Sequence, residues 1–113
     1  MNKTLALMIR GFESSSGRTP EFTAFCKTFK SEFKKELQPV GATNIVFSIG
    51  HFYISGFYTV GTQPWYFCLD DVRWHPGNSI LFRKAVDYKD FTGGVNQWAK
   101  IESGMGMKMH AKL

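Results

Sequence analysis

IVFSIGHFYISGFYTVGTQPWYFCLDDVRW, which runs from Ile45 to Trp74, holds nine of the chain's eighteen aromatic residues. Apolar and polar residues alternate along much of it, and glycine-containing breaks fall at Gly50-His51 and from Gly61 to Pro64. Alternation with a period of two is typical of strands. Glycine followed by one further residue suits a two-residue hairpin turn, so Gly50-His51 is the expected first turn. The stretch therefore predicts two or three antiparallel strands.

Both faces of the predicted sheet carry aromatic side chains. One face of the second strand collects Phe52, Ile54, Tyr58 and Val60, and the other collects Tyr53, Ser55, Phe57 and Thr59. Gly56 lies in the middle of this strand, which often marks a bulge or a close backbone approach. In the third strand Trp65, Phe67 and Leu69 alternate with Tyr66 and Cys68. A single helix covers one face, so we expect the second face, with Tyr53, Phe57 and either Trp65 or Tyr66, to be covered by terminal segments or to form a binding site or homodimer interface.

One amphipathic helix is predicted from Thr19-Pro20-Glu21 to about Leu37. Threonine suits the cap, proline the first helical turn, and glutamate the positive end of the helix dipole. Spacings of three and four residues place an apolar stripe on this helix, made of Phe22, Phe25, Phe29 and Phe33 with Cys26 beside them. We expect that stripe to be core, with Lys27, Lys30 and Lys34 on the opposite face. Gln38-Pro39-Val40-Gly41 should end the helix.

The rest of the chain completes the predicted fold. Thr4 to Ile9 is a short apolar run that reads as a strand, and Ser79 to Val86 is a further strand candidate. Residues 87–98 are rich in turn-forming residues. The predicted fold class is α+β, with one amphipathic helix packed on a four- to five-stranded, mainly antiparallel sheet. We expect a single domain over residues 1–101 and a flexible tail over residues 102–113.

Composition narrows the function classes only a little. The chain has 113 residues, a formal net charge of +5 and a pI of about 9.4. A positive charge favours acidic partners such as nucleic acid, although it also simply aids solubility. The N-terminal apolar run is too short for a signal peptide or a membrane span, so a cytoplasmic protein without membrane contact is expected. Cys26 and Cys68 are expected to be reduced, buried thiols.

The sequence contains one weak pattern that could carry catalysis. Asp70 or Asp71, followed by Asp87-Tyr88-Lys89, imitates the D…(D/E)-x-K arrangement of metal-dependent nucleases, in which carboxylates hold a divalent cation. The alternative is that these aspartates close turns and pair with Arg73, Arg83 and Lys89. Neither a zinc motif nor a glycine-rich phosphate loop is present. We therefore predict no catalytic residues, no metal site and no cofactor.

A basic and aromatic surface is the stronger candidate for function. Its predicted members on the last strand and the following loop are Arg73, Arg83, Lys84, Lys89, Tyr88, Phe91 and Trp98. Rings interleaved with cations suit single-stranded nucleic acid, where bases stack and phosphates are neutralised. They equally suit a protein interface. The remaining alternative is a structural loop that wraps its own aromatic rings over the open sheet face.

Three segments resemble parts of small uncharacterised proteins carried by phages and plasmids of low-GC Gram-positive bacteria. They are GFESSSGRTPEF from Gly11, GHFYISGFYTV from Gly50 and RKAVDYKDFTGG from Arg83, and the resemblance extends from Gly11 to Trp98. It implies a non-enzymatic binding protein of a mobile element, with anti-CRISPR-type inhibitors of a host nuclease or of its nucleic acid among the candidates. Because this chain is basic, a DNA-mimic mechanism is not expected.

These observations rank three functions. The first is non-catalytic binding of nucleic acid or a nucleoprotein complex, as an inhibitor of host defence, with Lys27, Lys30, Lys34, Arg83, Lys84 and Lys89 supplying charge and Tyr88, Phe91 and Trp98 stacking or anchoring. The second is a protein-only interaction module that occupies the site of a host nuclease. The third is a small metal-dependent nuclease.

Overall fold

The protein is one helix packed on a five-stranded antiparallel sheet, which confirms the predicted α+β class. The computed structural model describes residues 20–50, 52–70, 79–91 and 94–100. In chain order these form α2 (Pro20–Leu37), η1 (Gln38–Val40), β1 (Ala42–Ile49), β2 (Ile54–Val60), β3 (Gln63–Leu69), β4 (Ser79–Lys84) and β5 (Gln97–Lys100). The strands follow one another in the order β1-β2-β3-β4-β5, and each pairs antiparallel with the next. The predicted strand from Thr4 to Ile9 and the predicted tail lie outside the described residues.

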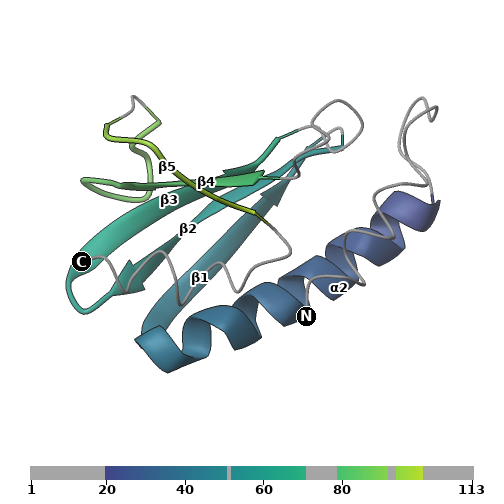
Figure 1. Cartoon of the computed structure of the whole chain (residues 1–113), viewed down its shortest axis with the longest axis horizontal. Helices are drawn as coiled ribbons and strands as arrows, with labels where there is room; N and C mark the ends of the chain where they lie inside the picture. The colour runs from purple at the N-terminus through teal and green to yellow at the C-terminus, as the bar shows by residue number, and fades with distance from the viewer. Residues whose placement is uncertain (1–19, 51, 71–78, 92–93, 101–113) are drawn as a thin grey trace.

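Helix α2 lies along one face of the twisted sheet, with β1 as its nearest strand (Figure 1). Its phenylalanine stripe is the centre of the core, as predicted, and each of the four phenylalanines is completely buried. Phe33 packs against rings of the sheet, with its centroid 4.4 Å from that of Phe67 and 6.3 Å from that of Phe82. Each ring of this size removes roughly 150–250 Å² from water, so the stripe fixes the helix on the sheet.

The helix ends where the sequence predicted. Pro39 interrupts the α-helical hydrogen bonding, and the chain passes through the short 3₁₀ helix η1. Gly41 then adopts a left-handed backbone with a φ of 79°, and its N–H donates to the Gln38 carbonyl over 3.0 Å. Glycine takes this conformation without the steric cost of a side chain, so the chain turns directly into β1.

The first hairpin differs from the prediction. β1 and β2 are joined by a four-residue loop, closed by the Gly50 N–H donating to the Tyr53 carbonyl, and not by the two-residue turn Gly50-His51. Within it Phe52 has a φ of 61°, which is costly for a bulky residue, but its ring is fully buried 4.7 Å from that of Phe22. This burial against the helix offsets the backbone strain and favours a four-residue loop over a two-residue turn.

The two-residue turn with glycine first occurs instead at Gly61-Thr62. Val60 pairs directly with Gln63, so only these two residues connect β2 to β3. Gly61 has a φ of 64°, the positive value that such tight hairpins require at this position. The predicted type of turn, with two residues and glycine first, was therefore correct, but its predicted position was wrong.

Gly56 marks a close approach, as predicted. A Cβ at this position would collide with the Val46 carbonyl oxygen, and it would lie 2.9 Å from the Phe67 ring. The Phe67 ring thus fills the space that a side chain at residue 56 would need. The pairing of β1 with β2 is also irregular between Thr43 and Val46, which bends the edge of the sheet.

The second face of the sheet is partly covered by the segment that follows β4. Phe57 and Tyr66 face this side, whereas Trp65 is buried in the core beneath α2. Tyr88 and Phe91, from the segment after β4, pack on Phe57 with centroids 5.3 Å away in each case. Residues 97–100, of which Gln97 and Trp98 were expected in a loop, form β5.

Candidate functional site

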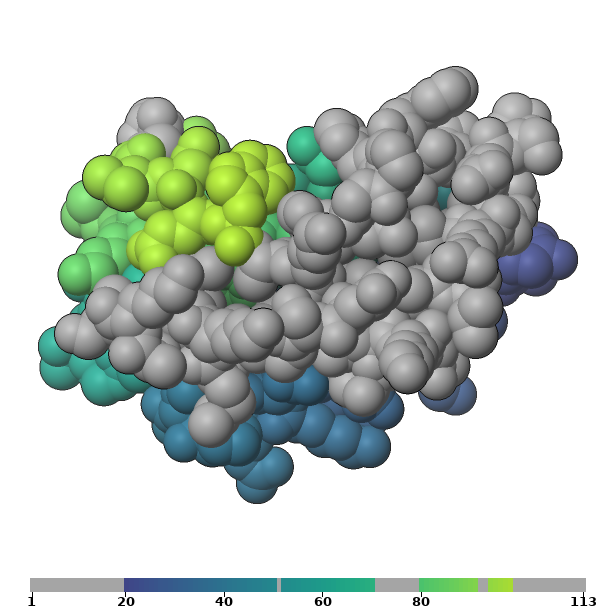
Figure 2. Space-filling view, in the orientation of Figure 1, coloured from purple at the N-terminus to yellow at the C-terminus, as the bar shows by residue number. Residues whose placement is uncertain are grey.

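The predicted binding residues fall into two separate groups. The helix lysines line a groove between α2 and the sheet, whereas the predicted residues after β3 lie on β4, on β5 and in the segment between them. In the view of Figure 2 the side chains of α2 and those near β5 gather at opposite sides of the molecule. Arg73, which was predicted to join the second group, lies outside the described residues. A single surface made of all the predicted residues is therefore not what the fold assembles.

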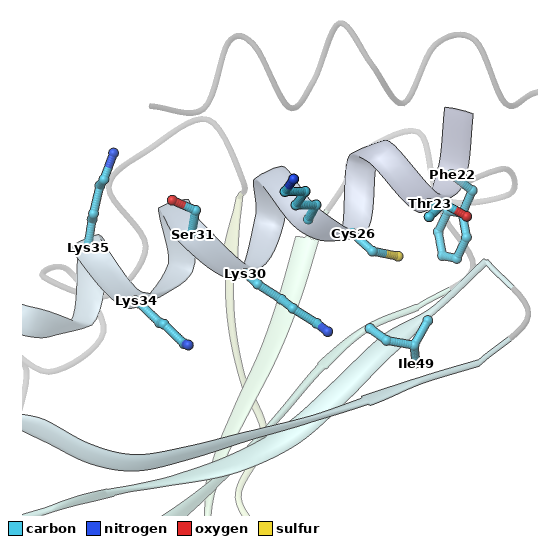
Figure 3. Close-up of a pocket in the computed structure, with 9 residues that line it drawn as sticks. Phe22, Thr23, Cys26, Lys30, Ser31, Lys34, Lys35 and Ile49 are labelled. Carbon is cyan, nitrogen blue, oxygen red and sulfur yellow. The ribbon is translucent and has the colours of Figure 1, made fainter. Parts of the chain in front are cut away.

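The first group forms a concave site of about 680 Å³, which we name the lysine groove. Helix α2 contributes both charged or polar side chains and the apolar Phe22 and Cys26, and Ile49 of β1 lies on the sheet side (Figure 3). The lining residues are Phe22, Thr23, Cys26, Lys27, Lys30, Ser31, Lys34, Lys35 and Ile49. Four of these nine described residues carry a positive charge and none of the nine is acidic, so this part of the lining is positively charged.

The lysines do not lie opposite the apolar stripe, as was predicted, but beside it. Lys30 and Lys34 follow Cys26 at intervals of four residues, so they continue the side of the helix on which Cys26 is buried. Figure 3 shows both side chains pointing from α2 toward the sheet, whereas Lys35 points away. Glu32 and Glu36 follow Phe25 on the other side of the stripe. Charges are thus segregated across the helix, with the basic side toward the groove.

Two of the ammonium groups converge on one aromatic ring. The Nζ atoms of Lys30 and Lys34 lie 5.8 and 5.9 Å from the centroid of Phe47 on β1. The negative face of the ring attracts each cation, which holds both amines near Phe47. Among the described carboxylates, only Glu32 pairs with a groove lysine, and it binds Lys35 over 3.7 Å. Lys30 and Lys34 thus have no carboxylate partner among the described residues.

Arg83 does not belong to the exposed charge that the sequence predicted. Its side chain is 3% exposed and lies on the second sheet face, with its guanidinium carbon 4.4 Å from the centroid of Tyr66. Its Nη2 donates to the Asp90 carbonyl over 2.6 Å, and its Nη1 is 3.8 Å from the Asp90 carboxylate. Arg83 thus holds the loop after β4 in place, and its charge is compensated inside the protein. Asp90 was missed because nothing in its sequence context distinguishes it from other loop acids.

Tyr88 and Phe91 also serve the loop that carries them. The Tyr88 hydroxyl donates to the Asn44 carbonyl over 2.8 Å and accepts from the Thr59 hydroxyl over 2.7 Å. Phe91 keeps 67% of its surface exposed while its ring meets Phe57 and Tyr66 edge to face. This geometry matches the alternative in which the loop wraps its aromatic rings over the sheet.

Besides Phe91, three predicted members of the second group remain accessible. Lys84, at the end of β4, and Lys89, in the following loop, are exposed. Trp98 on β5 is 57% exposed and pairs across the sheet with Leu81. Val95 is 84% exposed in the preceding segment. These side chains form the part of the second group that could still contact a partner.

Nucleophilic chemistry has little support on the second face. Burial raises the pKa of the Cys68 thiol, which makes the reactive thiolate scarcer. Burial, together with the neighbouring Cys68, also raises the pKa of the Tyr66 phenol to about 12, although Arg83 opposes the shift. Cys26 and Cys68 are both free thiols, in agreement with the prediction that they are reduced.

The aspartates of the nuclease-like pattern have local roles where they are described. The Asp87 carboxylate accepts the Lys89 backbone N–H over 2.8 Å, which closes the loop on itself. The Cys68 thiol lies 3.9 Å from the Asp70 carboxylate. Within residues 20–50, 52–70, 79–91 and 94–100, no three acidic, histidine or cysteine side chains gather as a metal site would need. Asp71 lies outside these ranges, so the pattern stays a hypothesis.

No known protein family, curated protein or solved structure matches this chain significantly. The resemblance to proteins of phages and plasmids therefore stays a prediction from the sequence. In the described part of the chain, no helix is long and apolar enough to cross a membrane.

Proposed function

We propose that this protein is a non-catalytic binder of nucleic acid, free or within a nucleoprotein complex, and that the lysine groove makes the contact. One observation carries the proposal. Lys27, Lys30, Lys34 and Lys35 line the same groove, and no acidic residue is among the lining residues that the structure describes. Lysine is a common phosphate ligand because its ammonium group acts as a compact point charge. A row of such charges suits a phosphate backbone.

The row also has a suitable length. Lys27, Lys30 and Lys34 are spaced over seven residues of α2, which corresponds to about 10 Å along the helix axis. One strand of nucleic acid places a phosphate about every 3.4 Å along a duplex axis. The groove lysines can therefore reach a run of about three phosphates, given the flexibility of their side chains.

Salt-dependent binding of labelled oligonucleotides tests the proposal. Binding through phosphates should weaken steeply as salt rises, because each neutralised phosphate releases counterions. Removing two groove charges in Lys27→Gln/Lys34→Gln should lower the affinity and reduce the slope of log K against log salt by about 1.4 for single strands. Absence of binding at low salt would rule the proposal out.

The matched control removes the same charge from the other surface. Lys84→Gln/Lys89→Gln also lowers the net charge by two, and both residues are exposed. This variant should retain most of the wild-type affinity and slope. If it weakens binding as much as the groove variant does, the contact lies at the β4–β5 segment or depends only on net charge.

A second candidate function is a protein-only interaction, which the exposed apolar side chains favour. Phe91, Val95 and Trp98 are 67%, 84% and 57% exposed, and large exposed apolar groups often mark protein interfaces. In the cytoplasm, which the N-terminal sequence led us to expect, and in the mobile-element setting that the resemblance implies, either function would let the protein inhibit a host nuclease. Failure to bind nucleic acid, together with specific binding to such a nuclease that Trp98→Ala abolishes, would favour this second candidate.

A further inference from the structure

We infer that the lysine groove selects single-stranded over duplex nucleic acid, because lysines and apolar side chains line it together. This inference rests on the proposed function and names the ligand class of the same site. The helix side carries four lysines with Thr23 and Ser31, and also the apolar Phe22 and Cys26. On the sheet side, the described lining residue is Ile49 of β1, a neutral apolar side chain that is partly buried (Figure 3).

A single strand has the same two-sided character as the groove. Its phosphates form one anionic edge, and its unpaired bases leave apolar surface on the other side. With the phosphates on Lys30 and Lys34, the sugars and bases face Ile49 across the groove. The strand therefore gains electrostatic contacts on one wall and apolar contacts on the other.

A duplex cannot match both walls. Its bases are stacked inside, and both of its outer edges are phosphate. With one backbone on the lysines, the rest of the duplex offers Ile49 no exposed base surface. A duplex is thus held by phosphate contacts alone, as in non-specific binding.

The size of the groove supports the same choice. About 680 Å³ lies within the range of roughly 300–1,000 Å³ that is usual for small-ligand sites. Such a site admits a few nucleotides of one strand. The amines of Lys30 and Lys34 converge on Phe47, so a phosphate bound between them would reduce their mutual repulsion.

Fluorescence anisotropy with the full chain tests the inference. The probes are a short labelled single-stranded oligonucleotide, the duplex of the same sequence, and inorganic tripolyphosphate as a competitor. We expect the single strand to bind about tenfold more tightly than the duplex at equal salt. Tripolyphosphate should compete only weakly, because it lacks the apolar edge.

Two substitutions on β1 measure the contribution of Ile49 to binding separately from that of the lysines. Ile49→Thr keeps a β-branched residue and removes apolar surface from the groove. It should therefore lower the affinity for the single strand by about threefold and leave the affinity for the duplex unchanged. Val46→Thr makes the same kind of change on the other side of β1, where Val46 is 46% exposed, and should change neither affinity.

The outcomes distinguish the inference from the proposed function. Equal or tighter binding of the duplex, with Lys27→Gln/Lys34→Gln still weakening both ligands, overturns the strand preference and leaves nucleic-acid binding intact. An equal loss of both affinities in Ile49→Thr also overturns it. Absence of binding to either ligand at low salt removes the inference and the proposed function together.

Discussion

The ring of Tyr88 stacks on the ring of Phe57, with centroids 5.3 Å apart and planes inclined by 16°. The two residues belong to the loop after β4 and to the central part of β2. From this position the Tyr88 hydroxyl reaches the Asn44 carbonyl at the irregular edge of β1. One side chain therefore links the loop to two strands that precede it by far in sequence.

Replacing Tyr88 should separate the contribution of its ring from that of its hydroxyl. Tyr88→Phe keeps the stack and loses both hydrogen bonds, so we expect the free energy of unfolding to fall by about 1 kcal/mol. Tyr88→Ala also loses the stack and should cost about 2 kcal/mol or more. Urea denaturation measures both values. Lys89→Gln, on the exposed neighbour, is the control and should change stability by less than about 0.5 kcal/mol; equal costs for Phe and Ala would contradict the stacking role.

Replacing only one residue of the Arg83–Asp90 pair should strongly lower the free energy of unfolding. Asp90→Ala leaves a nearly fully buried guanidinium without its carboxylate, and we expect a loss of about 3 kcal/mol. Asp90→Asn retains an acceptor for the Val86 N–H, which Asp90 binds over 2.9 Å, and should cost less. Arg83→Met combined with Asp90→Ala removes both charges. The double variant should therefore lose less stability than the sum of the losses in the two single variants. Strict additivity in urea denaturation would show that the two charges do not interact.

Local periodicity was enough to predict the helix, its buried stripe and most of the sheet. The spacing of Phe22 to Phe33 marks one face of a helix, and alternation from Trp65 to Leu69 marks one face of a strand. Both signals depend only on near neighbours in the sequence. The close approach at Gly56 could likewise be inferred, since glycine weakens a strand interior and is typical there of a bulge or a close backbone contact.

The errors lie where distant segments decide the outcome. Gly50-His51 looks like a tight turn, yet the loop length is set by the burial of Phe52 against Phe22, thirty residues earlier. The spacing of Lys27, Lys30 and Lys34 shows that they share a side of α2, but only the packing of α2 shows that this side meets β1. Arg83 reads as an exposed strand cation until Asp90 is placed beside it. The groove wall at Ile49 could not be predicted for the same reason.

Gly56→Ala should be among the most destabilising single substitutions. The new Cβ would collide with the backbone oxygen of Val46 and crowd the Phe67 ring, so β1 and β2 would have to separate locally. We expect a loss of about 3 kcal/mol or more, or failure to fold. Gly61→Ala is the matched control, because it meets no atom within 4 Å and has only the strain of its positive φ, about 1–2 kcal/mol. Circular dichroism and thermal unfolding measure both, and equal effects would contradict the close approach at Gly56.

Alkaline pH should destabilise the protein through two of its four tyrosines. Burial raises the pKa of Tyr58 far above its ordinary value of 10, and it raises the pKa of Tyr66 to about 12. Above pH 10 the unfolded chain releases these phenolic protons while the folded chain keeps them, so stability is complete below pH 10 and falls as pH rises toward 12. Urea denaturation at increasing pH should show this fall, and Tyr66→Phe should make it shallower between pH 10 and 12. A fall of the same steepness in Tyr66→Phe would show that the Tyr66 phenol is not protected by the fold.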